Sequence, residues 1–253
     1  MMDKRALRVC IVLSLFLTPL MFGIQTFEVA KANPFEIPPP NSIYIQSDGS
    51  INGTDKIYQN ENVYTLTDSL ILRYKSILIL KDTIVLDGDG FTLQGDGSPI
   101  SVGIFIENRN NVTVRNFIIT DFNHGIDCIG SSSVQITHNS LTGNNIGIQT
   151  FYDIQETMIV VYNNSFLNNT FHVSPTSGFN WDNGKTGNFW SSYNGTDAHG
   201  DGIGDTPYII DANNKDNYPL MLPINFTVDL YPTPQSTTTP SLSPTPSPTK
   251  SPS

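Results

Sequence analysis

A repeat of 22 residues in the middle of this 253-residue chain constrains its fold more than any other feature. Gly103, Gly125 and Gly147 are 22 positions apart, and each is followed by an isoleucine. Other apolar positions recur at the same spacing and alternate two by two within each repeat, which is the periodicity of strands. A fixed period of this length is typical of a solenoid, whose turns bury their apolar faces by stacking. The sequence therefore predicts an all-β fold, a right-handed single-stranded parallel β-helix of about four to five coils of ~22 residues with irregular N- and C-terminal caps.

Subtracting the length of a repeat from a residue number gives the residue that is expected to lie beside it on the preceding coil. A shift of 22 equates Cys128 with the inward-facing Ile106, so we expect a buried thiol that packs as a small hydrophobic side chain. A shift of 28 places Asp87 beside Arg115, which predicts an ion pair between neighbouring coils. The larger shift implies that this coil carries about six extra residues in the loop at 95–102.

Beyond residue 150 the repeat resumes with a shift of 25, so an insertion falls within residues 151–157. The same shift stacks Asn164 on Asn139 at one corner of the coils. Because an asparagine amide can satisfy backbone groups of the next turn, we expect these two residues to form a ladder.

The segments outside the repeat have distinct compositions. Positive charges at Lys4, Arg5 and Arg8, an apolar run and the Ala30-Lys-Ala32 sequence are typical of an export signal with a cleavage site. A retained membrane anchor is the alternative, but the run is short for a membrane span. The predicted parts are a signal peptide (1–32), a Pro-rich entry (33–40), an N-terminal cap (41–72), the coils (73–173), an aromatic C-terminal cap with an Asp/Gly-rich loop (174–231) and a disordered Pro/Ser/Thr-rich tail (232–253).

Charge and location limit the partners. Removing the leader, with its four basic and two acidic residues, leaves 9 basic and 21 acidic residues and a net charge of −12. This balance disfavours nucleic acid, and we expect no membrane insertion of the mature chain. The export signal predicts a secreted, cell-surface or cell-wall protein, and the tail is typical of a stalk or spacer.

One acidic loop is a candidate metal site. Asp197, Asp201 and Asp205 occupy positions 1, 5 and 9 of an EF-hand-like order, and Ile203 offers its carbonyl oxygen at position 7. Position 3 is a histidine and position 12 a tyrosine, where oxygen ligands are usual. We expect Ca²⁺ as the ion if this loop binds metal; a solvated Asp/Gly turn is the alternative. The four histidines are scattered, so the sequence shows no His/Met/Cys cluster of the kind that holds copper.

Any catalytic residues of the coils are expected on their outward face. The register aligns Phe105, Asp127 and Gln149 there, as a weak sugar-contacting strip or an ordinary solvated strand face. No aligned position holds two acids, whereas glycoside hydrolysis needs a carboxylate pair about 5–9.5 Å apart. His124 lies near Asp127 in the sequence, which is compatible with a hydrogen bond in a turn. The sequence therefore favours a protein that is not an enzyme.

The chain carries several N-glycosylation sequons. In an exported protein, exposed sequons are candidate sites for a glycan. The candidates are Asn52, Asn111, Asn163, Asn168, Asn194 and Asn225.

The chain from residue 42 to residue 222 resembles secreted right-handed β-helix proteins of the NosD-like periplasmic copper-binding family, especially its archaeal surface members. The matching pieces are SIYIQSDGSI, VYTLTDSL, DTIVLDGDGFTLQG, NNVTVRNFIITDFNHGI, GNFWSSYNGTDAHGDGIGDTPYIID and DNYPLM. The resemblance implies the β-helix fold and an extracytoplasmic surface suited to carbohydrate or another ligand. We expect a non-catalytic cell-surface protein that binds carbohydrate or mediates adhesion, with a surface polysaccharide or glycan as its partner. A polysaccharide lyase or hydrolase and a NosD-like copper-binding protein are the alternatives.

Overall fold

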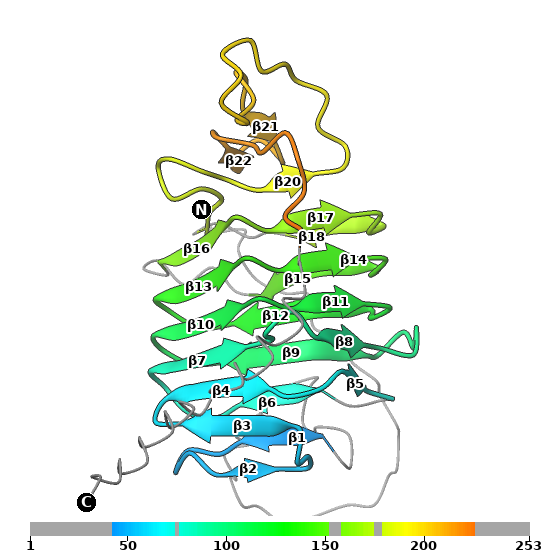
Figure 1. Ribbon diagram of the computed structural model, residues 1–253, viewed down its shortest axis with the longest axis vertical. Coiled ribbons are helices and arrows are strands. Elements are labelled where there is room, and N and C mark those ends of the chain that lie inside the picture. The colour runs from blue at the N-terminus through cyan, green and yellow to red at the C-terminus, as the bar shows by residue number, and fades with distance from the viewer. Residues whose placement is uncertain (1–41, 74–75, 152–157, 175–178, 226–253) are drawn as a thin grey trace, which may run out of the picture. The chain divides into compact units, whose positions relative to one another are not determined.

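The computed structural model describes residues 42–73, 76–151, 158–174 and 179–225. The predicted signal peptide, Pro-rich entry and disordered tail lie outside these residues, as does most of the predicted insertion within 151–157. In the described part, the strands stack into a solenoid of about five turns, and no helix is present (Figure 1). The all-β class and the parallel β-solenoid are confirmed.

Each turn contributes one strand to each of three sheets, here called sheets A, B and C, and two further strands form a small ribbon. Sheet A contains β1 (Ile43–Ile45), β2 (Ile51–Asn52), β6 (Ile77–Ile79), β9 (Val102–Glu107), β12 (His124–Ile129), β15 (Ile146–Phe151) and β18 (Phe171–Ser174). Sheet B contains β3 (Ile57–Asn60), β4 (Val63–Leu66), β7 (Ile84–Asp87), β10 (Val112–Arg115), β13 (Val134–Thr137), β16 (Ile159–Tyr162) and β19 (Phe179–Asn180). Sheet C contains β5 (Leu70–Ile71), β8 (Thr92–Gln94), β11 (Ile118–Thr120), β14 (Ser140–Thr142), β17 (Ser165–Leu167) and β20 (Phe189–Trp190), and the ribbon is β21 (Tyr208–Ile209) with β22 (Lys215–Asp216).

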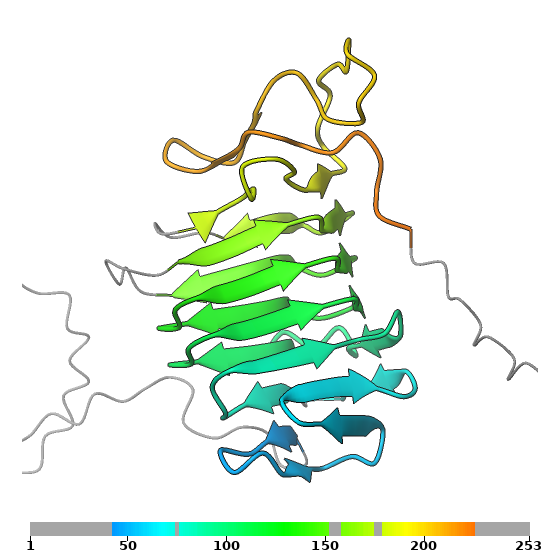
Figure 2. The same cartoon turned by 60° about the vertical axis from the view of Figure 1, so that its left-hand side comes forward.

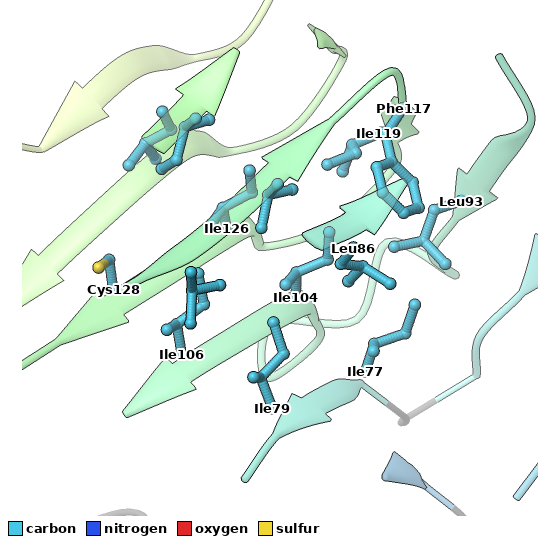
Figure 3. Packing of buried hydrophobic residues seen from close by; sticks show 14 of the residues in the cluster. Ile77, Ile79, Leu86, Leu93, Ile104, Ile106, Phe117, Ile119, Ile126 and Cys128 are labelled. Atoms are coloured by element: carbon cyan, nitrogen blue, oxygen red, sulfur yellow. The ribbon is translucent and has the colours of Figure 1, made fainter. Parts of the chain in front are cut away.

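The strand register in the structure agrees with the residue pairing that the repeat spacing predicts. Ile104, Ile126 and Ile148 are parallel partners on successive coils, and all three are buried. Figure 3 shows Ile104 and Ile126 inside the solenoid with Cys128 near Ile106. The Cys128 thiol is free and buried, so the prediction of an interior thiol that packs in the core is confirmed, and burial raises its pKa to about 12.

The repeated glycines have a steric cause. An added Cβ at Gly125 would lie 2.7 Å from the carbonyl oxygen of Gly147, and one at Gly103 would lie 2.5 Å from that of Gly125. The next coil therefore passes too close for any side chain at these positions. This close backbone approach explains why the 22-residue spacing begins on glycine in each repeat.

Buried asparagines link the coils at one corner. The Asn139 side chain accepts a hydrogen bond from the Phe117 N–H and donates to Val114 O. Asn164 lies on the next coil, and its Oδ1 accepts from both the N–H and the Nδ2 of Asn139. The predicted ladder is thus confirmed, and it satisfies backbone groups that the corner removes from the sheet ladders. The predicted ion pair is also present, with Arg115 Nε 2.7 Å from Asp87 Oδ2.

The stack extends past both predicted limits of the coils, 73 and 173. Strands β1, β4 and β5 of the predicted N-terminal cap already pair in parallel with the first complete coil. The antiparallel hairpins β1–β2 and β3–β4 then close that end (Figure 2). At the other end, β19 and β20 continue sheets B and C. No helix in the described part of the chain is long and apolar enough to cross a membrane.

Candidate functional site

The C-terminal cap continues the core of the solenoid with aromatic rings. Trp190 is buried and stacks on Phe166 of the last coils, with ring centroids 4.4 Å apart and planes 7° apart. Tyr208 stacks on the opposite side of Trp190 at 4.6 Å. Trp181 is also buried and meets Trp190 edge to face. These rings close the apolar end of the stack, and the rest of the cap lies beyond β20 (Figure 1).

The asparagine ladder runs on into this cap and ends on a carboxylate. Asn188 Oδ1 accepts from the N–H and Nδ2 of Asn164. Asp216 then accepts from the Asn188 N–H at 2.6 Å, from Trp190 Nε1 at 2.9 Å and from the Tyr218 N–H at 3.0 Å. Its carboxylate packs directly over Gly187, where an added Cβ would overlap the Asp216 oxygens. Asp216 is therefore the fixed centre around which the cap is folded.

Burial raises the pKa of Asp216 to about 6, although its hydrogen bonds act in the opposite direction. A carboxyl whose folded-state pKa is raised adds stability below its unfolded pKa of 3.8, and that stability is lost as pH rises through about 6. The Asp216→Asn variant should lack this dependence. We expect the stability of the wild type relative to this variant to fall by about 2–3 kcal/mol between pH 3.5 and 7.5.

Urea unfolding of both proteins across this pH range measures the difference. Comparing the two proteins is necessary because other groups titrate as well. Burial raises the pKa of Asp127 and lowers the pKa values of His138 and His172. A pH-independent difference between wild type and Asp216→Asn would show that Asp216 is not the titrating group.

A surface pocket of about 510 Å³ opens beside this centre. Its floor is apolar, with Val160 from the last coils, the half-buried Phe179 and the buried Trp181. Its rim is made of amides and charged groups from two loops of the cap. The rim residues are Asn180, Asp182, Asn183, Asn213, Asn214, Lys215 and Asn217, together with Gly184.

Part of this rim is fixed by hydrogen bonds within the cap. Asp182 accepts from the Gly184 N–H and from both the N–H and the Nδ2 of Asn217. Asn214 accepts from Trp181 Nε1 and donates to Asp211. These bonds hold the two loops in one arrangement, so the shape of the pocket is preformed.

Other rim groups remain available to a ligand. Among the described residues, the side-chain amides of Asn180 and Asn213 and the ammonium group of Lys215 make no hydrogen bond, and all three side chains are exposed. They line the same pocket as Val160, Phe179 and Trp181. The pocket therefore combines a rigid base with free donors and acceptors, the usual arrangement of a small-ligand site.

The outward strip predicted from the register has the expected alignment but not the expected exposure. Phe105, Asp127 and Gln149 are parallel partners on sheet A. However, Phe105 is 9% exposed, Asp127 0% and Gln149 7%, so the prediction of an open strip is wrong. Subtraction shows which way a side chain points, but it cannot show that something covers that face.

Asp127 is paired with the histidine expected from the sequence. His124 Nδ1 lies 2.9 Å from Asp127 Oδ1 and 3.2 Å from Oδ2. Burial raises the pKa of Asp127, and the histidine lowers it by a smaller amount. The Oδ1 atom is buried and accepts no hydrogen bond of good geometry. In this conformation the pair is closed to a polymeric ligand.

The Asp/Gly-rich loop turns its carboxylates toward its own backbone. Asp197 accepts from the N–H groups of Gly200, Asp201 and Gly202, and Asp201 accepts from that of Ile203. Asp205 is fixed separately: it accepts from the Ala198 N–H and pairs with His199 Nδ1 at 2.6 Å. The predicted ligands thus lie in one loop.

The predicted ligands of this loop form no shared cage. Among the described residues, no group of three or more His, Cys, Asp or Glu side chains is arranged to hold a metal ion. The Ile203 backbone is instead paired with Leu220 in an isolated bridge. Calcium binding at this loop stays a prediction.

The sequons lie at the surface of the described part. Asn163 is half-buried beside His138, and the other five asparagines are exposed. The exposed positions are Asn52, Asn111, Asn168, Asn194 and Asn225. Glycosylation at these positions stays a prediction.

The cap pocket is the functional candidate that the repeat did not predict. Its residues come from the segments NWDNG at 180–184 and ANNKDN at 212–217, which lie outside the coils. The density of Asn and Asp beside a tryptophan is the only sequence signal for it. That signal shows neither that the two segments meet nor which amides stay free.

The fold and the cap together define a parallel β-helix protein that is closed by an aromatic cap. Residues 36–195 match the family model described as periplasmic copper-binding protein (NosD), and the chain belongs to this family. Comparisons with curated proteins and with solved structures found no significant match.

Proposed function

We propose that this protein is a non-catalytic, extracytoplasmic glycan-binding β-helix whose ligand occupies the cap pocket. The observation that carries this proposal is the set of uncommitted polar groups over an apolar floor. Asn180, Asn213 and Lys215 line a pocket of about 510 Å³ together with Phe179. This volume is within the range of small-ligand sites, about 300–1,000 Å³.

The chemistry of the pocket suits a sugar. A side-chain amide offers both a donor and an acceptor, so it can bind two neighbouring hydroxyl groups of one ring. An aromatic ring packs well against the C–H face of a sugar. The net charge of −10 for the whole chain disfavours strongly acidic polymers, so a neutral or weakly charged glycan is the ligand class.

Glycan-array binding of the full chain, followed by titration with the best ligand, tests this proposal. Asn213→Ala and Asn180→Ala should each weaken binding about 10-fold, since a lost hydrogen bond contributes about 1.4 kcal/mol. Asn62→Ala is the matched control, because Asn62 is exposed at the opposite end of the stack. Loss of affinity in the control, or unchanged affinity in both pocket variants, would place the ligand elsewhere.

A non-catalytic role is favoured by the positions of the acids. The pocket holds one carboxylate, Asp182, and hydrogen bonds to Gly184 and Asn217 engage it. On sheet A, Asp127 lies between Phe105 and Gln149, so no second acid adjoins it in that column. A lyase or hydrolase remains the alternative. Polysaccharide turnover that disappears in Asp127→Ala would establish it and overturn the proposal.

Calcium is proposed as the ion of the Asp/Gly-rich loop. Binding would require the carboxylates of Asp197, Asp201 and Asp205 to exchange backbone N–H donors for the cation. Calorimetric titration of the full chain should show a binding heat that Asp201→Ala greatly reduces. Equal heats for wild type and variant would refute the site. Asp182→Ala is the control, because Asp182 is an aspartate outside the loop.

Copper binding, named in the family description, is not supported by the donors present. Copper in proteins favours histidine, cysteine and methionine ligands. In the described residues, Cys128 is buried in the core and the histidines belong to no metal-holding group. The residues therefore do not fit a copper centre. Equilibrium dialysis that found one bound copper ion per chain would contradict this.

The proposed location follows from the leader and the family. The family is described as periplasmic, which suggests a place outside the cytoplasm. The Lys4–Arg8 charges and the apolar run after them would direct export, and the Pro/Ser/Thr-rich residues 232–253 would act as a spacer. A surface polysaccharide is then the natural partner.

A further inference from the structure

The cap pocket contains one charged group that no neighbouring acid neutralises. Lys215 belongs to β22, and the β21–β22 ribbon pairs it with Ile209. Successive residues of a strand point to opposite sides, so Lys215 is exposed at the pocket while Asp216 is buried. Among the described residues, the Lys215 ammonium group forms no ion pair. Its positive charge is therefore available to a ligand.

The carboxylates near the pocket are committed to other donors. Asp182 accepts from both the N–H and the Nδ2 of Asn217. Asp211 accepts from both the N–H and the Nδ2 of Asn214. These bonds fold the two loops that form the rim, so neither acid can turn to Lys215 without loosening its own loop. An anionic group on the ligand meets no such cost.

We propose that the sugar in the cap pocket carries one carboxylate, which Lys215 binds. This inference rests on the proposed function of the pocket and names its ligand as a glycan with isolated uronic acid residues. The free amides of Asn180 and Asn213 would bind hydroxyl groups of the same sugar, because each offers a donor and an acceptor. The half-buried Phe179 ring would contact its C–H face.

The type of cation favours a carboxylate over a sulfate or a phosphate. The residues that line the pocket include one lysine and no arginine. Lysine acts as a single point charge, whereas the planar fork of arginine is better suited to anions with several oxygens. One ammonium group with neutral amides beside it therefore matches one carboxylate on a sugar ring.

The surroundings of the pocket limit the number of carboxylates that the ligand can carry. Lys215 is the one cation among the lining residues, so a second carboxylate would find no partner there. Asp182 lines the same pocket, Asp211 is bonded to its rim, and the whole chain has a net charge of −10. These charges repel an anionic polymer. A glycan in which an acidic sugar stands between neutral ones thus fits better than a continuous polyuronate.

Titration of the full chain with matched tetrasaccharides tests this inference. Series built on glucose, galactose and mannose each contain a neutral member, a member with one uronic acid and a member made only of uronic acids. We expect the single-acid member of the preferred series to bind about 10-fold more tightly than the other two, because a hydrogen bond to a charged group contributes more than one to a neutral group. Added salt should weaken only the acidic members.

Variants at Lys215 assign the preference to this residue. Lys215→Met keeps most of the side chain but removes the charge, so it should abolish the preference and leave the affinity for the neutral member unchanged. Lys215→Arg keeps the charge and should retain most of the preference. Lys185→Met is the matched control, because Lys185 is also an exposed lysine of the cap but does not line the pocket.

Several results would overturn the inference. The neutral and single-acid members could bind equally in every series, the all-acid member could bind most tightly, or the preference could survive in Lys215→Met. If a neutral member still binds and Asn213→Ala weakens it, these results refute the carboxylate alone and leave glycan binding at the pocket intact. If no tetrasaccharide binds, or if Asn213→Ala and Asn180→Ala change nothing, the proposed function fails as well.

Discussion

The Asn164→Ala variant is expected to lose about 4 kcal/mol of unfolding free energy. Asn164 is fully buried, and its Nδ2 donates to Ile136 O at 2.8 Å and to Tyr162 O at 3.0 Å. Its Oδ1 accepts from the backbone and the side chain of Asn139. Alanine leaves these groups buried without partners, and the break lies in the middle of a ladder that ends at Asp216.

Urea unfolding of Asn164→Ala beside Asn145→Ala measures this loss. Asn145 is the matched control because its amide makes one exposed hydrogen bond, to Asn123. The Asn145→Ala substitution should change the unfolding free energy by no more than about 0.5 kcal/mol. Similar effects for the two variants would mean that the ladder contributes nothing beyond an ordinary surface hydrogen bond.

The Gly125→Ala variant is expected to be about 3 kcal/mol less stable than the wild type. The added Cβ meets the Gly147 carbonyl oxygen at 2.7 Å and the Leu141 side chain at 3.2 Å. The first of these is backbone of the next coil, so it can move only if the parallel ladder between β12 and β15 also moves.

Gly97→Ala is the control for this substitution. An added Cβ at Gly97 meets nothing within 4 Å, so only its positive φ of 70° adds a cost, about 1 kcal/mol. Thermal unfolding should therefore separate the two variants by several degrees. Equal midpoints would show that the coils can spread without loss, against the close stacking described here.

The repeat made the stacked part of the fold predictable. Because a parallel coil places equivalent residues above one another, subtraction was enough to pair Asn139 with Asn164 and Asp87 with Arg115. It also placed Cys128 in the core. These are contacts between repeats, and each depends only on the period and on strand alternation.

Two features lay beyond that reasoning for different physical reasons. Phe105 and Asp127 point outward by strand alternation but are buried, because alternation determines the direction of a side chain and not its exposure. The cap pocket joins Asn180 to Asn213 through non-periodic loops arranged around Asp216. Only the folded chain shows which of its amides are committed and which remain free.

A crystal structure of the full chain with the best glycan from the array tests the central claim most directly. We predict that the sugar lies in the cap pocket, with hydroxyl groups hydrogen-bonded to Asn180 and Asn213 and a ring face against Phe179. A sugar bound along sheet A beside Asp127, with the cap pocket empty, would contradict the proposed function.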